Sequence, residues 1–368
     1  MAKTKLQEAA DLGQAIWLDY IRRSFLLSGG LKDYVGQGLR GVTSNPSIFS
    51  SAIKGSDDYD QDLQQYAKQG LPVEKIYEEL AVADIQLAAD ILKPVFDRTQ
   101  GVDGYISLEV NPHLAHDTNG SLSEAKRLFS RVDRPNVMIK VPATAEGLPA
   151  VQALLVAGLN INITLMFSQE QYDQVAEAYL SALEQRLADG KPIDQVASVA
   201  SIFVSRMDVK LDPLLAGMQT QPALKLQGKI GIANARLIYQ HFKQAFSGAR
   251  WDRLAAKGAR VQRVLYGSTS TKNPNYPDTL YADNLIGPQT VNTLPPETLE
   301  AFLDHGTVAL TLEKDLEAAQ ASLDELARLG IQLDEITRQL LDEGVEKFAQ
   351  PFDTLLANIA EKKARLLA

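Results

Sequence analysis

The sequence has no cysteine and only four histidines among its 368 residues. Without cysteine there is no disulfide framework, thiolate zinc site, iron–sulfur cluster or cysteine nucleophile. None of the histidines has the HExxH spacing of a zinc enzyme. Only His113 and His116 are close together, in a segment of loop residues. We therefore expect no histidine-ligated metal site.

Long basic runs and long apolar runs are also absent. Acidic residues outnumber basic ones by 46 to 37, for a net charge of −9, whereas a nucleic-acid-binding protein clusters Lys and Arg against phosphates. No run reaches the roughly 18 uncharged apolar residues that a membrane span needs. The N-terminal segment MAKTKLQEAADLG is polar, unlike a signal peptide. We expect a cytoplasmic protein that binds neither nucleic acid nor membranes and acts on a small ligand or a protein partner.

Short β-rich runs alternate along the chain with longer amphipathic stretches. This alternation indicates parallel strands joined by helical crossovers. Because we count eight such units, we expect an α/β fold of the (β/α)8 TIM barrel type, with an open doubly wound sheet as the alternative. The β-rich runs cover residues 15–21, 40–45, 104–110, 136–141, 160–167, 196–204, 263–269 and, with a partly loop-like pattern, 283–291.

Several helical stretches are expected between these runs, and two begin with capping signals. Ser121 with Glu124, and Ser168 with Gln171, follow the S-x-x-E/Q pattern of a helix start. The stretches cover residues 73–100, 121–131, 145–157, 168–188 and 222–246.

The last part of the chain, residues 313–368, has helical periodicity and no strand-like run. Turns are expected at Gly330 and at Pro351. We expect one barrel domain, residues 1–368, in which 313–368 form additional C-terminal helices packed on the outside of the barrel.

Lys140 is the first candidate for chemistry. The active site of a parallel barrel lies at the C-terminal ends of its strands, and Lys140 lies near the end of the apolar run VMIKVP (137–142). Burial favours the neutral amine, which can attack a carbonyl carbon and form a Schiff base. The same position also suits a lysine that reaches solvent or pairs with a carboxylate.

Two acidic residues occupy similar positions late in β-rich runs, Asp19 in AIWLDYI (15–21) and Glu109 in GYISLEV (104–110). Such acids serve as helix caps or salt-bridge partners about as often as they serve as catalysts. Schiff-base chemistry needs several proton transfers, and with so few histidines carboxylates must perform them. Thr164 is a candidate hydroxyl for holding a water with one of these acids.

Polar amides also lie at strand ends. Asn45 precedes Pro46, which disfavours helix at Asn45 and ends the strand there. Its amide could bind a substrate hydroxyl or merely end the strand. Asn160 and Asn162 share a face with Thr164 in an apolar run, where they need polar partners.

Two further segments could bind phosphate. The run VASVASIFVSR (196–206) contains Ser201 and ends in Ser205 and Arg206, and the loop GSTSTKN (267–273) contains Lys272. Barrels often bind phosphate beyond strands 7 and 8. Serine-rich loops also occur without any ligand, and this loop does not match a Walker A sequence.

Together these segments resemble the transaldolase family. The matching stretches are GVTSNPSIF (41–49), IKVPAT (139–144) with EGL (146–148), NINITLMFS (160–168) and SIFVSR (201–206). The resemblance implies a cofactor-free (β/α)8 transferase, active on sugar phosphates in the pentose phosphate pathway. Such enzymes move a dihydroxyacetone unit from sedoheptulose 7-phosphate to glyceraldehyde 3-phosphate, giving erythrose 4-phosphate and fructose 6-phosphate.

The resemblance also implies roles for individual residues. It makes Lys140 the Schiff-base lysine and Asp19 the acid–base group, with Glu109 and Thr164 positioning the catalytic water. It assigns binding of the dihydroxyacetone unit to Asn45 and Asn162, and phosphate binding to Ser201 and Arg206.

One loop departs from the family pattern. Many relatives have a GASFRN loop with a second phosphate-binding arginine, where this chain has Lys272 in GSTSTKN. Lysine keeps the charge but lacks the bidentate geometry of arginine. The alternatives are a fructose 6-phosphate aldolase that releases free dihydroxyacetone and a non-catalytic sugar-phosphate-binding protein. The sequence is compatible with a monomer or a homodimer.

Overall fold

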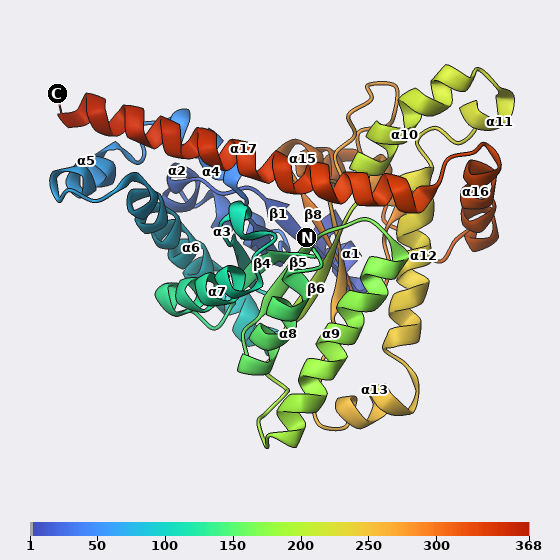
Figure 1. The fold of residues 1–368 in the computed structure, drawn as a ribbon, viewed down its shortest axis with the longest axis horizontal. Helices are drawn as coiled ribbons and strands as arrows, with labels where there is room; N and C mark the ends of the chain where they lie inside the picture. The colour runs from blue at the N-terminus through green and yellow to red at the C-terminus, as the bar shows by residue number, and fades with distance from the viewer. Residues whose placement is uncertain (1–2, 368) are drawn as a thin grey trace.

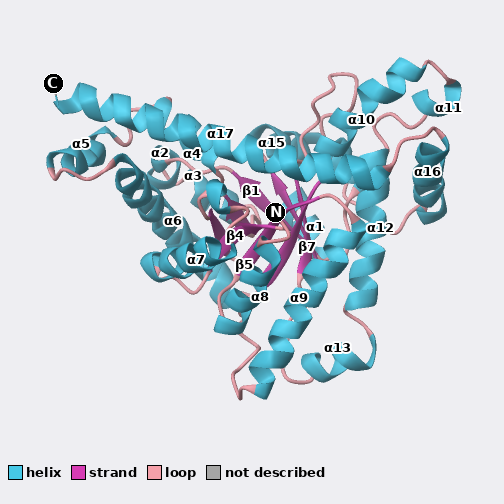
Figure 2. Cartoon of the chain, in the orientation of Figure 1, coloured by secondary structure: helices cyan, strands magenta, loops and turns pink. Residues whose placement is uncertain are grey.

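The computed structural model describes residues 3–367, which form a closed barrel of parallel strands in the order β1 to β8, with β8 paired to β1 (Figure 1). Helices surround the barrel (Figure 2). The predicted (β/α)8 fold is confirmed, and the open doubly wound sheet is excluded because the barrel has no free edge. The strands are β1 (Gln14–Asp19), β2 (Gly41–Thr43), β3 (Tyr105–Glu109), β4 (Val137–Pro142), β5 (Ile161–Met166), β6 (Ser198–Phe203), β7 (Arg263–Gly267) and β8 (Thr290–Leu294).

Each strand is followed by at least one helix, and several connections carry extra helices. None of the helices among residues 3–367 has the length and apolar character of a membrane span. The helices before β4 are α1 (Lys5–Asp11), α2 (Arg23–Leu27), α3 (Gly30–Gly36), α4 (Pro46–Lys54), α5 (Asp60–Lys68), α6 (Val73–Arg98), the 3-10 helix η1 (Pro112–Leu114) and α7 (Thr118–Val132). Those after β4 are α8 (Gly147–Ala157), α9 (Gln169–Ala188), α10 (Ser205–Met218), α11 (Gln221–Leu224), α12 (Ile230–Ala245), α13 (Gly248–Ala255), α14 (Leu280–Asn284), α15 (Pro296–His305), α16 (Leu316–Arg328) and α17 (Leu333–Leu367).

Side chains fill the barrel interior because alternate residues of each strand point inward. A buried cluster fills the half nearer the strand N-termini; it consists of Ala15, Trp17, Tyr105, Met138, Ala197, Val199, Leu265 and Val291. Two positions beyond Trp17 on β1 stands Asp19, and two beyond Met138 on β4 stands Lys140. The polar candidates therefore form the next layer, at the C-terminal ends of the strands.

The C-terminal helices cover two different parts of the barrel. α16 packs against α12, whereas α17 contacts α4, α5, α6 and β5. In Figure 1, α17 is the long red helix that runs across the molecule at the end of the barrel where the strands terminate. The division into one barrel domain with a helical extension from about residue 313 remains our interpretation; Ala368 lies outside the described residues.

Of the two turns predicted in this region, the one at Gly330 is present and the one at Pro351 is not. Gly330, with φ of +83°, does lie between α16 and α17. Pro351 lies inside α17, although a proline leaves the carbonyl four residues earlier without its helical partner. The helix continues through Pro351 because Phe348 and Phe352, on either side, are both buried and anchor it by packing.

The capping prediction succeeds for one helix and fails for another. Ser168 and Gln171 form the expected capping box at the start of α9. The start of α7 is instead capped by Asp117, whose Oδ1 accepts a hydrogen bond from the Gly120 N–H at 2.9 Å. Ser121 lies inside the helix. Aspartate caps a helix as well as serine does, and the helix therefore begins one turn before the S-x-x-E pattern predicts.

Two other boundaries also differ from expectation. The last strand, expected at 283–291, is β8 at Thr290–Leu294, and the earlier part of that run belongs to α14 and a loop. The helical stretch expected at 222–246 is divided into α11 and α12. Gly228, with φ of +68°, lies in the turn between them, a conformation that glycine adopts readily.

Candidate active site

Lys140 lies at the centre of the candidate site, between two strand neighbours. The strand register pairs it with Glu109 of β3 and Asn162 of β5. Its Nζ lies 3.2 Å from Glu109 Oε2 and donates a hydrogen bond to the Ser44 carbonyl oxygen at 3.1 Å. Lys140 and Glu109 are 5% and 8% exposed, so water screens the pair little. The buried lysine and the carboxylate partner considered from the sequence are both present.

Asp19 ends β1 and is held by a chain of hydroxyl groups. Its Oδ1 accepts a hydrogen bond from Thr43 Oγ1 at 2.5 Å, and Thr43 Oγ1 lies 2.7 Å from Thr293 Oγ1. Desolvation raises the pKa of Asp19, against the opposing effects of the Lys140 charge and the Thr43 hydrogen bond. The raised pKa brings this carboxyl closer to the range in which a group both takes up and releases protons.

Glu109 shares the electrostatic environment of Asp19. Burial raises its pKa, the charge and hydrogen bond of Lys140 oppose the rise, and the negative charge of Asp19 adds to it. Glu109 does not border the cavity that contains Lys140; it lines a neighbouring one of about 190 Å³ with Tyr77 and Phe352. The two carboxyl groups therefore interact electrostatically at this end of the barrel.

The polar residues of β5 are fixed by their neighbours. Asn162 Nδ2 donates to Ser107 Oγ at 3.1 Å, and Asn162 Oδ1 accepts from Ser201 Oγ at 2.6 Å. Thr164 Oγ1 is buried and has no hydrogen-bond partner among residues 3–367. Because buried hydroxyl groups are normally satisfied, this one is available to a water or a substrate.

Asn45 has a structural role as well as a place in the site. It is the N-cap of α4, and its Oδ1 accepts a hydrogen bond from the Ile48 N–H at 3.0 Å. The strand-ending role considered from the sequence is therefore present. The cap occupies the side-chain oxygen and leaves the amide N–H groups able to donate.

Arg206 lies between two aromatic rings at the start of α10. Its Cζ lies 4.9 Å from the ring centroid of Phe203 and 5.5 Å from that of Phe348. Its Nη1 is buried without a hydrogen-bond partner in the described part of the chain, and burial lowers its pKa. A guanidinium with a buried and unsatisfied donor favours binding of an anion.

The loop after β7 contributes serine hydroxyls beside Lys272. Ser268, in the left-handed region with φ of +52°, has its Oγ 2.8 Å from Ser205 Oγ. Lys272 is exposed, and its Nζ donates to Ser270 Oγ at 2.7 Å.

A cavity of about 180 Å³ brings together all but one of the site residues predicted from the sequence, the exception being Glu109. No group of three or more His, Asp or Glu side chains among residues 3–367 is arranged to hold a metal ion. The predicted residues that line the cavity are Asp19, Asn45, Lys140, Asn162, Thr164, Ser201, Arg206 and Lys272.

Sequence reasoning missed several residues that line the same cavity. Thr43 and Phe203 lie within matched segments, two residues from Asn45 and Ser201, and the alternation of strand side chains could have indicated them. Phe348 comes from α17, and no local pattern distinguishes it from an ordinary core phenylalanine. The missed lining residues are Thr43, Phe203, Leu265, Thr293, Pro295 and Phe348, whereas Gly267, Ser268 and Ser270 belong to the loop already considered for phosphate binding.

Comparison with known proteins agrees with this geometry. Residues 16–359 match the family model described as Transaldolase/Fructose-6-phosphate aldolase. The chain is 46% identical to a protein of Nostoc punctiforme named Transaldolase 2, over 98% of each chain. It is also 46% identical to the transaldolase of Thermobifida fusca, over 98% of each chain, and to that of Thiobacillus denitrificans, over 96% of this chain and 99% of the relative. Among solved structures, a 2,3-dimethylmalate lyase aligns over 95% of this chain and 96% of its own at a TM-score of 0.28 and 10% identity, too distant to inform the function.

The closed barrel and the buried lysine define an α/β-barrel enzyme of the kind that the sequence predicted. The chain belongs to the transaldolase/fructose-6-phosphate aldolase family, since the family model covers most of its length. The resemblance drawn from the motifs is therefore confirmed, and within the family the relatives compared above are named transaldolases.

Proposed function

We propose that the chain is a transaldolase that transfers a dihydroxyacetone unit from sedoheptulose 7-phosphate to glyceraldehyde 3-phosphate, giving erythrose 4-phosphate and fructose 6-phosphate. One observation carries the proposal: Lys140 is buried 3.2 Å from Glu109 and lines a small cavity together with Asp19. The family and the names of the relatives support the same activity. We further propose a cytoplasmic location and a monomeric or homodimeric state.

The first step is formation of the Schiff base. The Lys140 amine attacks C2 of the ketose, and the carbinolamine loses water to give an iminium ion. The Glu109 carboxylate is within reach of the proton that Nζ must release. Glu109 and Thr164 are proposed to position the water that leaves and later returns to hydrolyse the imine. Since Thr164 Oγ1 is unpartnered among the described residues, it has a free donor and acceptor for this water.

The second step is cleavage of the C3–C4 bond. Asp19 takes the proton of the C4 hydroxyl group, and the electrons of the broken bond pass into the iminium to form an enamine. The aldehyde fragment then leaves. When the acceptor aldehyde arrives, the enamine carbon attacks it and Asp19 returns the proton. The hydrogen bond from Thr43 at 2.5 Å orients the carboxylate for both transfers.

The remaining residues are proposed to bind the two ends of the sugar phosphate. The amide groups of Asn45 and Asn162 bind hydroxyls of the dihydroxyacetone unit, and Ser201 positions Asn162 through their hydrogen bond. Arg206, with Lys272 at the cavity rim, binds the distal phosphate. Anchoring the phosphate at a fixed distance from Lys140 aligns C2 with the amine, which lowers the entropic part of the barrier.

A coupled assay for erythrose 4-phosphate tests the proposal. With sedoheptulose 7-phosphate and glyceraldehyde 3-phosphate as substrates, we expect erythrose 4-phosphate and fructose 6-phosphate to appear in equal amounts. Without an acceptor aldehyde, little free dihydroxyacetone should be released from fructose 6-phosphate. Rapid release without an acceptor, at a rate matching or exceeding transfer, would instead make the chain an aldolase.

A further inference from the structure

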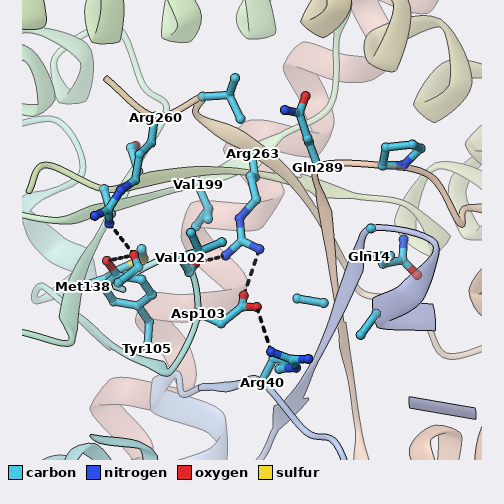
Figure 3. Close-up of a pocket in the computed structure, with 18 of the residues that line it drawn as sticks. Gln14, Arg40, Val102, Asp103, Tyr105, Met138, Val199, Arg260, Arg263 and Gln289 are labelled. Carbon is cyan, nitrogen blue, oxygen red and sulfur yellow. Dashed lines mark hydrogen bonds and ion pairs between the residues drawn. The ribbon is translucent and has the colours of Figure 1, made fainter. Parts of the chain in front are cut away.

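A second, larger cavity opens at the opposite end of the barrel, where the strands begin. Its volume is about 540 Å³, and it shares no lining residue with the cavity around Lys140. Figure 3 shows its residues converging from the starts of several strands. We call it the N-terminal cavity; it is lined by Ala10, Gly13, Gln14, Ala15, Arg40, Gly101, Val102, Asp103, Tyr105, Met138, Ala197, Ser198, Val199, Trp251, Ala259, Arg260, Val261, Arg263, Pro288 and Gln289.

The charged residues of this cavity are unbalanced in sign. Arg40, Arg260 and Arg263 line the cavity together with a single carboxylate, Asp103, so three positive charges and one negative charge leave a net charge of +2. Arg263 Nη1 donates to Asp103 at 2.8 Å, whereas Arg40 Nη1 lies 3.7 Å from the same carboxylate (Figure 3). A local excess of positive charge in a chain with a net charge of −9 favours an anionic ligand.

The arginines keep donors that the protein does not use. Arg260 donates to the carbonyl oxygens of Gly101, at 2.5 Å, and Gln100, at 2.7 Å, which fixes its guanidinium while leaving other N–H groups free. Arg40 has Asp103 as its one ion-pair partner within residues 3–367. These two side chains can therefore hydrogen-bond an anion without first breaking a short ion pair.

Other parts of the wall are apolar, and small side chains leave the space open. Ala15 of β1 and Ala197, just before β6, occupy positions where larger residues would fill the barrel mouth. Met138 and Val199 close its inner end. A ligand with an apolar body and an anionic group matches these features.

We propose that the N-terminal cavity binds a small organic anion, with an apolar or aromatic body and a carboxylate, sulfonate or phosphate group. The anionic group pairs with Arg260 and the body packs against Met138 and Val199, while Arg40 adds positive charge at another part of the wall. This site is separate from the Lys140 chemistry and does not depend on the function proposed above.

Anilinonaphthalene sulfonate is a suitable probe, because it combines an aromatic body and a sulfonate. We expect saturable binding of one probe per chain, followed by its fluorescence. Arg260→Gln should weaken binding by about tenfold, the loss of one charge-assisted hydrogen bond, and Arg40→Gln should weaken it less, because it removes only a more distant positive charge. Two controls, Arg328→Gln on the exposed surface of α16 and Arg206→Gln in the Lys140 cavity, should bind as the unaltered protein does.

A second readout does not depend on the variants folding. In unaltered protein labelled at its methionine methyl groups, the bound naphthalene ring should shift the NMR signal of Met138, while that of Met218, on α10 outside the cavity, stays in place. The proposal is overturned if the Met138 signal does not move at saturation. It is also overturned if folded Arg40→Gln and Arg260→Gln proteins bind normally, or if Arg206→Gln is the substitution that abolishes binding.

Discussion

Lys140 and Glu109 face each other across the β3–β4 register, with their charged groups 3.2 Å apart in the barrel interior. Burying either charged group alone would carry a large desolvation cost, and the attraction between the two groups offsets part of that cost. The pair is therefore held by the sheet itself rather than by a loop. Strand pairing places the amine at the bottom of the cavity with an acid–base partner already in contact.

Asp19→Asn should separate Schiff-base formation from bond cleavage. The amide cannot take the C4 hydroxyl proton, so we expect turnover to fall by about 10²- to 10⁴-fold. Imine formation at Lys140 should continue, and borohydride with fructose 6-phosphate should still label the variant. Asp11→Asn, on the exposed surface of α1, is the matched control and should turn over normally. Equal loss of labelling and turnover would mean that Asp19 acts in forming the imine.

Thr43→Val should move the pH dependence of the reaction. The Thr43 hydrogen bond lowers the pKa of Asp19, so its loss raises that pKa further above 3.8. Asp19 must be ionised to act as a base, and activity therefore falls as the pH drops through its pKa. We expect the acidic limb of the kcat/KM profile to move to higher pH in Thr43→Val. An unmoved limb, or one at lower pH, would show that Asp19 is not the titrating base.

Phe348→Leu tests the contribution of α17 to substrate binding. The ring lies 5.5 Å from both Lys140 Nζ and Arg206 Cζ, and loss of a cation–π contact costs about 1 kcal/mol. We expect KM for fructose 6-phosphate to rise about fivefold, since Arg206 loses support. Phe352→Leu is the matched control one turn along the helix; it packs against Tyr77 and should lower stability without changing KM. Identical KM values for the two variants would show that Phe348 does not contribute to substrate binding.

Asp208 should make stability depend on pH away from the active site. Burial raises its pKa to about 7, and it accepts hydrogen bonds from the Gly231 N–H and the Tyr281 hydroxyl. Because the folded pKa exceeds the ordinary value of 3.8, its stabilising contribution is complete below about pH 4 and is lost as the pH rises to about 7. Urea unfolding should show the free energy of the unaltered protein falling by about 2 kcal/mol, relative to Asp208→Asn, between about pH 5 and 8. A constant difference between the two proteins would contradict this.

The fold was predictable because strand-like and helical patterns are local. The alternation indicated the barrel and most strands, but β8 was misplaced because its residues Thr290–Leu294 contain little apolar contrast with the loop before them. Pro351 looked like a helix end because the tertiary anchors on both sides of it, Phe348 and Phe352, have no local signature.

The site was predictable where it lies on strands and hidden where it depends on distant contacts. Lys140, Asp19 and Asn162 occupy strand ends that a barrel brings together. The sequence could not show that Phe348, about 140 residues from Arg206, would pack against it, because a long helix must first cross the barrel. Nor could it show that the hydroxyl of Ser201 would be used by Asn162, since that depends on the side-chain geometry of adjacent strands.

Borohydride trapping tests the central claim most directly. With fructose 6-phosphate present, reduction should attach a three-carbon dihydroxyacetone unit or the intact sugar to one residue, and peptide mass spectrometry should place it on Lys140. Lys140→Arg keeps the charge but not a nucleophilic amine, so it should remain unlabelled and lose about 10⁴-fold or more of its turnover. Labelling at another lysine, or an active and unlabelled Lys140, would contradict the account.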